Sequence, residues 1–598
     1  MAHLKTGPKI ILIILLVGGF VFGLRKAAEL GWIPTPGVMK ALVPEKAALP
    51  DVKEALVQNV EPVALPTATA ASIPATLIRG EIWEWNAQMN LIYANGGAST
   101  TKGSLMEKHG VNLALIRQDD TGKMQEDLIA CAREISNGSS QCSNGANFVV
   151  IMGDGSGQFL AAINPQLKKL GNDYQAKVIG ATGYSRGEDS LMAPPEVKSN
   201  PEKAKGLLVE GVLRDGDWNI AQKWEGDNGI KNNPDEKTWD PDAVNWINAS
   251  DYNVAAADYV AGKCDTRKVV KDGHITGEPD KHVCVNAVVT WTPGDVTIAK
   301  GKGGLVKVVS SKQYRSQMPA VILGPKNFFE RNRAEFEGLL AATFEAGDQI
   351  KAFDQVLHKA SAISAKVYAD QDEAYWYKYY KGVTESDAQG LKVDLGGSTV
   401  NNLADNLILF GLEPGTNDNF RSTYTVFANI ATQQYPALFK DTPIPDVKDI
   451  EDKSYITGAQ ARMSSGGAEG EAPQYAANES GPVVSKRSYS INFDTGKATF
   501  TPEGVRTMSE LKDSLAITGL FIQVDGYTDN TGSEGVNQAL SDARAAAVKD
   551  WLQKHAPRNF PDNRFKIVGH GSQNPVATND TAAGKAANRR VEITLSGS

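Results

Sequence analysis

The sequence lacks the short motifs that identify many metal-dependent and nucleotide-dependent enzymes. Its 598 residues contain no HExxH zinc motif, no Gly-Lys pair followed by Ser or Thr, and no zinc-finger spacing. The glycine-rich residues 153–157 have no lysine after them, as a phosphate-binding loop would require. We therefore predict no enzymatic activity, no cofactor and no metal site. A hydrolase of unfamiliar pattern in the middle of the chain is the alternative, because a missing motif excludes little.

The sequence also lacks an excess of positive charge. There are 62 Lys and Arg residues against 70 Asp and Glu residues, so the net charge is −8 at pH 7. Because phosphate-backbone binding needs a basic surface, we predict no binding of nucleic acid. Apolar residues make up 41% of the chain and aromatic residues 8%, which is typical of folded globular proteins. At usual domain sizes, the length allows roughly three or four domains.

Residues 10–24 form an uninterrupted apolar run between Lys9 and Arg25. The run is shorter than the about 20 residues that cross a bilayer as a helix, but snorkelling basic side chains extend its reach. Arg25 and Lys26 stand where a signal peptide would have its small-residue cleavage site. We therefore predict an uncleaved membrane anchor over residues 1–32, with a cleaved signal peptide as the alternative. The run contains no Asp or Glu, which argues against ion-driven work within the membrane.

The middle of the chain alternates short apolar runs with amphipathic stretches, which is an α/β pattern. Proline-rich residues 33–77 precede it as a semi-extended stalk, and Gly- and Ala-containing residues 446–487 follow it as a flexible linker. Several apolar runs end in small polar turns, and open α/β sheets bind ligands at the carboxyl ends of strands. The candidate solute-binding residues are Asn95, Gly96, Gly97, Asp154, Ser156, Ser185, Arg186 and Trp291.

Two of these candidates have plainer interpretations. Trp291 follows a predicted strand, where an aromatic side chain is more often part of the core. Arg186 lies close in sequence to Glu188 and Asp189, so a surface ion pair is the alternative to a ligand contact.

Near the C-terminus, the strand-like residues 520–527 break at a cluster of turn formers and lead into a helical pattern. Apolar residues recur along that helix at spacings of three and four: Leu540, Ala543, Ala547, Val548, Trp551 and Leu552. Arg544 falls in this apolar lane, and Asp529 lies in the turn. An Asp and an Arg so placed suit the ammonium and the carboxylate of one zwitterionic ligand. The alternative is an ordinary capping Asp529 and an Arg544 that snorkels to solvent.

These C-terminal residues resemble the peptidoglycan-associating domain of OmpA, Pal and MotB. The resemblance covers roughly residues 488–596. It rests on separated motifs in the family's order, namely 491–496, 527–533, Asn537, Leu540, Ser541, Arg544, Ala545, 569–571, Asn574, Pro575, Asn579 and 586–593. Tyr527 stands where many members of the family have histidine. The resemblance implies a small α/β domain that binds peptidoglycan noncovalently.

The same resemblance implies roles for single residues. The matching aspartate and arginine of that family hold the ammonium and carboxylate of diaminopimelate in the peptide stem of peptidoglycan. The asparagine and the backbone after the threonine are expected to add hydrogen bonds, and one of two adjacent arginines to lie near the pocket. The predicted peptidoglycan-binding residues are Asp529, Thr531, Asn537, Arg544, Arg589 and Arg590. Such a ligand places most of the chain in the periplasm and its anchor in the inner membrane.

Residues 78–445 resemble periplasmic solute-binding proteins of the two-lobed kind, such as those for nitrate, sulfonates and thiamine precursors. The resemblance is carried by residues 93–97, by the segment that leads to 111–113, and by 288–293. It implies two lobes around a cleft that is lined by the candidate turns and holds a small-molecule ligand.

The chain has four cysteines, which are Cys131, Cys142, Cys264 and Cys284. None forms a CxxC pair, and neither His274 nor His282 has zinc-finger spacing to them. An even number of cysteines in the periplasm favours disulfides. We predict that each cysteine pairs with its nearer neighbour in sequence, because each such pair brackets a polar, turn-rich loop. Crossed pairings and free thiols are the alternatives.

The sequence therefore predicts an α/β protein in five parts, which are an N-terminal transmembrane helix (1–32), a stalk (33–77), a two-lobed domain (78–445), a linker (446–487) and a smaller OmpA-like α/β domain (488–598). The predicted function is that of a membrane-anchored binding protein of the periplasm that is attached to peptidoglycan. One alternative is a structural envelope tether whose central domain binds no ligand. Another is a stator-like subunit of a membrane complex, with a membrane-protein partner.

Overall fold

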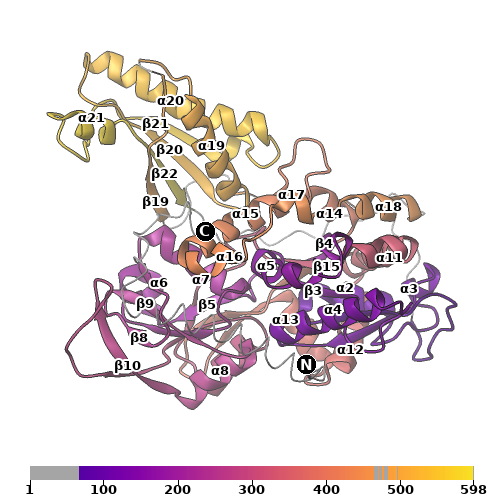
Figure 1. Ribbon diagram of the computed structural model, residues 1–598. Coiled ribbons are helices and arrows are strands. Elements are labelled where there is room, and N and C mark those ends of the chain that lie inside the picture. The colour runs from indigo at the N-terminus through magenta and orange to yellow at the C-terminus, as the bar shows by residue number, and fades with distance from the viewer. Residues whose placement is uncertain (1–65, 464–468, 471–474, 477–482, 495, 597–598) are drawn as a thin grey trace, which may run out of the picture.

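A computed structural model describes residues 66–463, 469–470, 475–476, 483–494 and 496–596. It consists of two lobes and a smaller C-terminal domain, which is yellow in Figure 1. The predicted anchor and most of the predicted stalk lie outside the described residues. Within the described ranges, no helix is both long and apolar enough to cross a bilayer.

The first lobe is built on a six-stranded sheet of order β18-β4-β15-β3-β1-β2. Its strands are β1 (Ile78–Ile82), β2 (Leu113–Arg117), β3 (Phe148–Met152), β4 (Ala176–Ser185), β15 (Pro319–Pro325) and β18 (Ser398–Val400). Strands β1, β2 and β3 are parallel, whereas β15 runs antiparallel to both β3 and β4. All five residues of β3 are buried, because helices cover both faces of such a sheet.

The second lobe has its own six-stranded sheet, of order β14-β5-β13-β6-β9-β7. Its strands are β5 (Ser190–Ala193), β6 (Leu208–Gly211), β7 (Lys231–Asn233), β9 (Ala243–Asn248), β13 (Ala287–Thr290) and β14 (Val306–Ser310). Strands β6, β7, β9 and β13 are parallel. At one edge lies a small sheet of β8 (Thr238–Trp239), β10 (Cys264–Lys271), β11 (His274–Ile275) and β12 (Lys281–Cys284).

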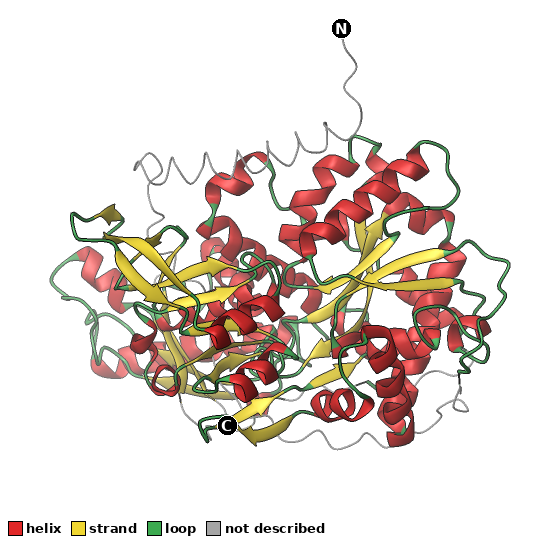
Figure 2. Cartoon of the chain, turned by 90° about the horizontal axis from the view of Figure 1, so that it is seen from below, coloured by secondary structure: helices red, strands yellow, loops and turns green. Residues whose placement is uncertain are grey.

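The chain passes between the lobes more than once. It leaves the first sheet at the end of β4 and enters the second with β5, and it returns between β14 and β15. The hairpin of β16 (Val383–Ser386) and β17 (Lys392–Leu395) packs with the second lobe, after which β18 rejoins the first sheet. The mixed α/β architecture that the sequence predicts is therefore confirmed, and Figure 2 shows the two groups of strands with helices around them.

Helices surround both sheets. Those of the second lobe are α6 (Pro195–Ser199), α7 (Gly216–Asn228), α8 (Tyr252–Ala261) and α9 (Gly294–Gly301), whereas α13 (Glu373–Lys381) packs mainly on the first lobe. Those of the first lobe are α2 (Met89–Asn95), α3 (Leu105–Lys108), α4 (Thr121–Ser136), α5 (Ser156–Leu167), α10 (Lys326–Arg331), α11 (Arg333–Ala352), α12 (Asp354–Tyr368), α14 (Leu403–Leu409), α15 (Asn419–Gln434), α16 (Pro436–Asp441), α17 (Val447–Ile450) and α18 (Ser454–Arg462). Helices α17 and α18 belong to this core through Ile450, Tyr455 and Ile456, so the central region extends beyond the predicted boundary at 445.

The C-terminal domain has a four-stranded sheet of order β19-β22-β20-β21. Its strands are β19 (Val483–Tyr489), β20 (Phe521–Gly526), β21 (Phe565–Gly569) and β22 (Val591–Ser596), and its helices are α19 (Pro502–Ala516), α20 (Glu534–His555) and α21 (Ala582–Asn588). Helix α19 begins with Thr501 as its N-cap and Pro502 in its first turn, which is a favourable start. Its apolar face, with Met508 and Leu511, closes a separate core over the sheet.

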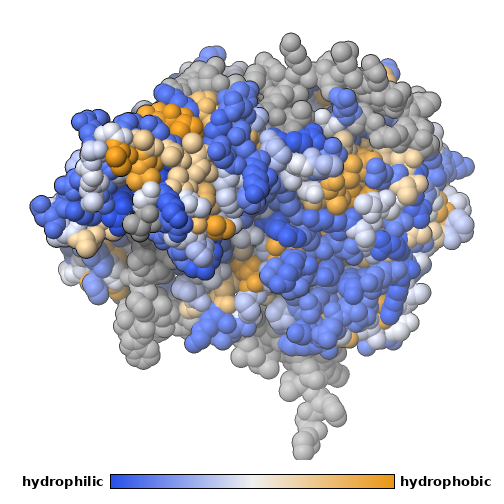
Figure 3. Space-filling model, turned by 90° about the horizontal axis from the view of Figure 1, so that it is seen from above, coloured by the Kyte–Doolittle hydropathy of each residue, from blue (hydrophilic) through white to orange (hydrophobic). Residues whose placement is uncertain are grey.

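The C-terminal domain is packed against α15 of the first lobe. Phe427 and Ile430 of α15 form a small apolar cluster with Ile517. The Asn417 amide donates to the Asn559 side chain at 2.8 Å, which adds a polar contact next to this cluster. Seen from above, hydrophilic side chains cover much of the molecule and apolar ones gather in small patches (Figure 3).

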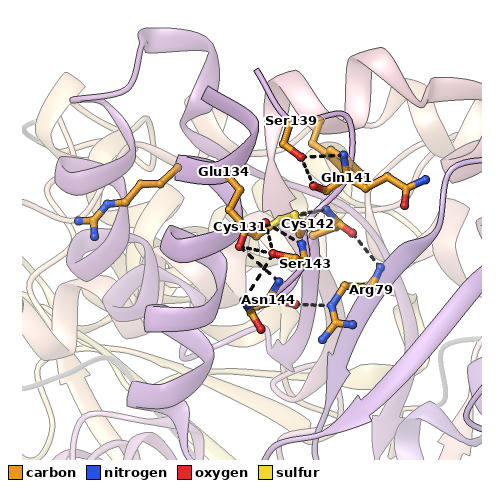
Figure 4. Close-up of a disulfide and its surroundings, with 12 residues drawn as sticks. Arg79, Cys131, Glu134, Ser139, Gln141, Cys142, Ser143 and Asn144 are labelled. Atoms are coloured by element: carbon orange, nitrogen blue, oxygen red, sulfur yellow. Dashed lines mark hydrogen bonds between the residues drawn. A yellow bond between two sulfur atoms is a disulfide. The ribbon is translucent and has the colours of Figure 1, made fainter. Parts of the chain in front are cut away.

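Both predicted disulfides, Cys131–Cys142 and Cys264–Cys284, are present. The first ties the end of α4 to the loop before β3, and Figure 4 shows its surroundings. There the Glu134 carboxylate accepts hydrogen bonds from the backbone and side chain of Ser143. The second joins β10 to β12 at a directly paired position of their ladder.

We predict that the two disulfides are reduced in a fixed order. Cys131 and Cys142 are only 1% and 7% exposed, whereas Cys264 and Cys284 lie at the surface. Because thiol exchange needs access to sulfur, dithiothreitol should open Cys264–Cys284 first. Loss of the buried bond should follow, and each bond should contribute about 2–4 kcal/mol to stability. Alkylation and peptide mapping along a dithiothreitol series measures the order, and labelling of Cys131 before Cys284 would contradict it.

Candidate functional site

The turn after β20 places Asp529 at the surface end of the C-terminal sheet. Thr528 donates from its backbone to the Gly571 carbonyl oxygen at 2.8 Å, which ties this turn to the one after β21. The Asp529 carboxylate then accepts from the Thr531 amide at 2.8 Å and closes an Asx turn. Ser533 caps the first turn of α20. Local hydrogen bonding therefore fixes both the aspartate and the start of the helix.

Arg589 lies beside Asp529 and forms an ion pair with it. Its guanidinium donates to the second carboxylate oxygen at 2.6 Å, and the arginine side chain is 44% exposed. Burial opposes the charge on Asp529, but the Arg589 and Thr531 hydrogen bonds outweigh it, so the pKa of Asp529 lies below its ordinary value. The pair remains accessible to a ligand from solvent.

Arg544 reaches the same place from α20. It is 6% exposed, its Nε donates to the Lys497 carbonyl oxygen at 3.2 Å, and its guanidinium lies 5.0 Å from the centre of the Phe493 ring. Burial lowers the pKa of Arg544, and so does the charge of Arg589, while Asp529 raises it. The guanidinium groups of Arg544 and Arg589 repel each other, so a ligand carboxylate bound between them would be favourable.

The other predicted wall-binding residues differ in position. Asn537 is buried on α20, and its amide nitrogen has no hydrogen-bond partner among the described residues. Thr531 is exposed, and its hydroxyl accepts from Lys585 at 3.3 Å. Thr531 borders the cluster through its amide bond to Asp529, and Asn537 lies about two helical turns before Arg544 on α20.

Arg590 points away from this cluster. Its guanidinium pairs with Glu592 at 2.7 Å and lies 3.7 Å from the centre of the Tyr527 ring. Neighbouring residues at a strand face opposite sides, so only one of the two adjacent arginines can reach Asp529. Arg589 therefore lies beside Asp529, whereas Arg590 is held by Glu592.

The buried face of α20 differs from the predicted apolar lane. Ala543 is exposed, and Leu540 and Ala547 are only half-buried. The residues that do face the sheet are Asn537, Ser541, Arg544, Ala545, Val548 and Leu552. A Cβ on Gly526 would lie 2.3 Å from the Ser541 carbonyl oxygen, so the helix crosses the strand closely. Small and polar residues occupy this contact, and an apolar periodicity cannot reveal them.

In the central region, residues 95–97 lie at the wrong edge of the sheet for the predicted ligand site. Asn95 ends α2 and donates from its side chain to the carbonyl oxygens of Gly97 at 2.9 Å and Leu113 at 3.2 Å. Leu113 is the first residue of β2, so this turn is at the amino ends of the parallel strands. Gly96 adopts φ 78° as the helix C-cap. The prediction that Asn95, Gly96 and Gly97 line a cleft at the carboxyl ends is corrected.

Arg186 is half-buried, and in the described residues it forms no ion pair with Glu188 or Asp189, which are both buried. Its guanidinium donates to the Arg315 carbonyl oxygen at 2.5 Å and lies 4.2 Å from the centre of the Tyr184 ring. Burial lowers the pKa of Arg186 to about 10. The alternative interpretation of Arg186 as a surface pair is therefore excluded by its position.

Ser185 and its neighbours match a hydrolase pattern, since residues 183–187 read Gly-Tyr-Ser-Arg-Gly. A nucleophile turn of that pattern needs an exposed serine between a strand and a helix. Ser185 instead is buried, and strand β5 follows it. Its hydroxyl is 2.5 Å from that of Ser311 and accepts from the Asp189 amide at 3.2 Å. This arrangement does not expose a nucleophile.

Asp154, Ser156 and Trp291 do lie at carboxyl ends of strands. Asp154 follows β3, and Ser156 opens α5 with its hydroxyl bonded to the Gly153 carbonyl oxygen at 2.5 Å. Trp291 follows β13 in the second lobe and stacks on Trp83, which follows β1 in the first. Of the predicted solute-binding residues, Asp154 and Trp291 are thus brought to the junction of the lobes.

Comparison with known proteins confirms the C-terminal prediction. Residues 492–589 match the OmpA family. The peptidoglycan-binding protein ArfA of Mycobacterium tuberculosis is 41% identical over 106 residues, or 18% of this chain and 32% of ArfA. Outer membrane protein A of Bordetella avium is 38% identical over 120 residues, or 20% of this chain and 60% of that protein. The chain therefore spans less than two thirds of the length of these relatives.

Solved structures show two separate similarities. The cell wall anchor of the T6SS from Pseudomonas aeruginosa is 32% identical, covers 19% of this chain and 81% of its own, and has a TM-score of 0.17. The periplasmic nitrate-binding protein NrtA from Synechocystis PCC 6803 is 11% identical, covers 66% of this chain and 90% of its own, and has a TM-score of 0.44. The second similarity concerns the central region and is too low to define its ligand.

Proposed function

We propose that the C-terminal domain binds peptidoglycan by gripping a zwitterionic amino acid of the peptide stem, such as diaminopimelate. Asp529 takes the ammonium group, and Arg544 with Arg589 takes the carboxylate. The observation that carries this proposal is the convergence of one carboxylate and two guanidinium groups from three separate segments of the domain. A ligand of both charges satisfies each group, whereas a simple anion or cation leaves one end unmatched.

The half-exposed Arg589 gives the ligand a way in. Its side chain is 44% exposed, whereas that of Asp529 is 10% exposed, so solvent screens the pair on the arginine side and Arg589 can leave the carboxylate. The ligand ammonium can replace Arg589 at Asp529, and the released Arg589 then joins Arg544 at the ligand carboxylate. Asn537, whose amide nitrogen has no hydrogen-bond partner among the described residues, supplies a further donor.

The test compares two kinds of cell wall. Sacculi with diaminopimelate carry a carboxylate next to the free ammonium of the stem side chain, and walls with lysine at that position lack it. The full-length protein should pellet with the first and stay largely in solution with the second, and free diaminopimelate should release it. Equal binding to both walls would refute recognition of the zwitterion.

For the rest of the chain, we propose a periplasmic location with residues 10–24 as an anchor in the inner membrane. The support is the apolar run followed directly by Arg25 and Lys26. The protein should then remain in the membrane fraction after a high-salt wash, and its mature N-terminus should lie at or near Met1. N-terminal sequencing that begins beyond Leu30 would overturn the anchor.

A further inference from the structure

Where the two lobes meet, several buried carboxylates come together. Asp154 follows β3 of the first lobe, Asp217 opens α7 of the second, and Asp189 lies in the segment that crosses between them. All three are at most 1% exposed. Their charges act on one another, and burial together with Asp189 and Asp154 holds the pKa of Asp217 well above its ordinary value. We call these three residues the interlobe carboxylates.

The interlobe carboxylates have acceptor oxygens that the protein does not use. Gln317 donates to one Asp154 oxygen at 2.8 Å, but the other has no hydrogen-bond partner among the described residues. Neither oxygen of Asp189 or of Asp217 accepts a regular hydrogen bond in the described parts of the chain, and the two carboxyl groups lie close enough to share a proton. Nearby Asp215 differs, since Thr121 and the Gly216 amide each donate to it at 2.9 Å, and it caps α7. Asp215 thus has a structural role as a helix cap. The interlobe carboxylates have no such role that would explain their burial.

The basic group that acts on Asp189 is held by other partners. Lys307 acts on Asp189, but its ammonium is bound to Asp295 at 2.8 Å and to the Gly187 carbonyl oxygen at 2.6 Å. A buried carboxylate without a counter-charge is costly, and such a group is normally paired or liganded.

Aromatic side chains from both lobes border the same place. Burial raises the pKa of the Tyr252 hydroxyl, and so do the charges of Asp215, Asp217 and Asp154; the hydroxyl has no regular hydrogen-bond partner among the described residues. The Tyr252 ring centre is 4.1 Å from that of Trp291, which stacks at 5.5 Å on Trp83 of the first lobe. The Trp291 indole donates to the Glu84 carbonyl oxygen at 3.0 Å, which fixes its orientation.

A metal ion does not fit this arrangement. In the described residues, the group of ligating side chains whose donor atoms converge within 4.8 Å is Cys264, His282 and Cys284, whose cysteines form a disulfide. The interlobe carboxylates are more widely spread than one cation requires. Unused acceptor oxygens need N–H donors, and aromatic faces favour organic cations.

We propose that the junction of the lobes is a binding site for an aliphatic amine with more than one ammonium group, held by Asp154, Asp189 and Asp217 against the Tyr252 and Trp291 rings. The carboxyl ends of parallel strands from both sheets face this junction, which is where α/β proteins bind ligands. Because the carboxylates are closed off from solvent, the lobes must separate for the amine to enter. This site does not depend on wall binding.

The test is thermal unfolding and calorimetric titration of the full-length protein with spermidine, putrescine, choline and nitrate. Spermidine and putrescine should raise the Tm of the central region, and choline, which lacks N–H donors, and nitrate should not. Asp217→Asn should weaken amine binding about tenfold or more, since it removes one charge-assisted contact. The same variant should have an equal or higher Tm without ligand, because the raised pKa keeps Asp217 neutral and the amide can donate to the neighbouring Asp189 carboxylate in its place.

Asp242→Asn, on the surface of the same lobe, is the matched control and should leave amine binding unchanged. Asp189→Asn is the second variant, should Asp217→Asn fail to fold as judged by circular dichroism. A shift with nitrate but not with amines, no shift with any probe, or amine binding that survives both variants would overturn the proposal. Sacculus binding should be unchanged in both variants, which separates this site from the wall-binding one.

Discussion

Arg544→Ala should weaken binding of the full-length protein to diaminopimelate sacculi by about 30-fold or more. Removing one member of a buried, hydrogen-bonded charge pair costs about 2–5 kcal/mol, because the partner charge is left desolvated. Arg544 is largely buried and held from two sides, by the Lys497 carbonyl oxygen and the Phe493 ring, so it is already oriented for its ligand. Pull-down across a protein concentration series measures the loss.

Asp529→Ala should cause a loss of similar size, and the double variant should be hardly worse than either single one. Both side chains grip one small ligand, so their contributions are coupled and not additive. Arg506→Ala is the matched control, because Arg506 is an exposed arginine of the same domain that pairs with Glu503 within α19. Undiminished pull-down by folded Arg544→Ala protein would refute the assignment.

The C-terminal site could be predicted because its residues come in a fixed local order. Asp529 is held by a turn whose hydrogen bonds lie within a few residues, and Arg544 is carried by the helix that follows directly. The choice between Arg589 and Arg590 could not be made from sequence, because it depends on which face the chain presents as it enters β22. Only Arg589 is brought to Asp529.

The central site could not be predicted to the same depth. In sequence, a small polar turn after an apolar run looks the same whether it lies at the amino or the carboxyl ends of the strands. Residues 95–97 follow a helix and lie at the amino ends, which is not where such sheets bind ligands. Asp154 and Trp291 could be predicted from the sequence, because each lies within two residues of the end of a strand. Asp217 and Tyr252 each open a helix after a strand, but their meeting depends on how two lobes pack, which no local pattern encodes.

The largest stability effect should come from Arg564, a buried arginine of the C-terminal domain. It is fully buried, and its guanidinium donates to the carbonyl oxygens of Leu520, Asn559, Leu515 and Thr518 at 2.7–2.9 Å. Burial lowers the pKa of Arg564 to about 10, which still leaves it charged at neutral pH. One side chain therefore joins the end of α19, the start of β20 and the loop after α20.

Arg564→Met should destabilise the C-terminal domain by on the order of 3–5 kcal/mol, enough to unfold much of it at 37 °C. The substitution keeps the apolar stem but leaves several buried carbonyl oxygens without donors, and each such acceptor costs about 1–3 kcal/mol. Arg564→Lys should recover only part of this loss. The lysine ammonium is compact and has three donors, so it cannot reach all four carbonyl oxygens that the planar guanidinium contacts. Arg558→Ala, which removes a half-exposed pair with Glu413 nearby, should cost about 1 kcal/mol or less. Scanning calorimetry of the three full-length variants separates these values, and an Arg564→Met transition as high as that of Arg558→Ala would show that the four carbonyl contacts do not hold the domain together.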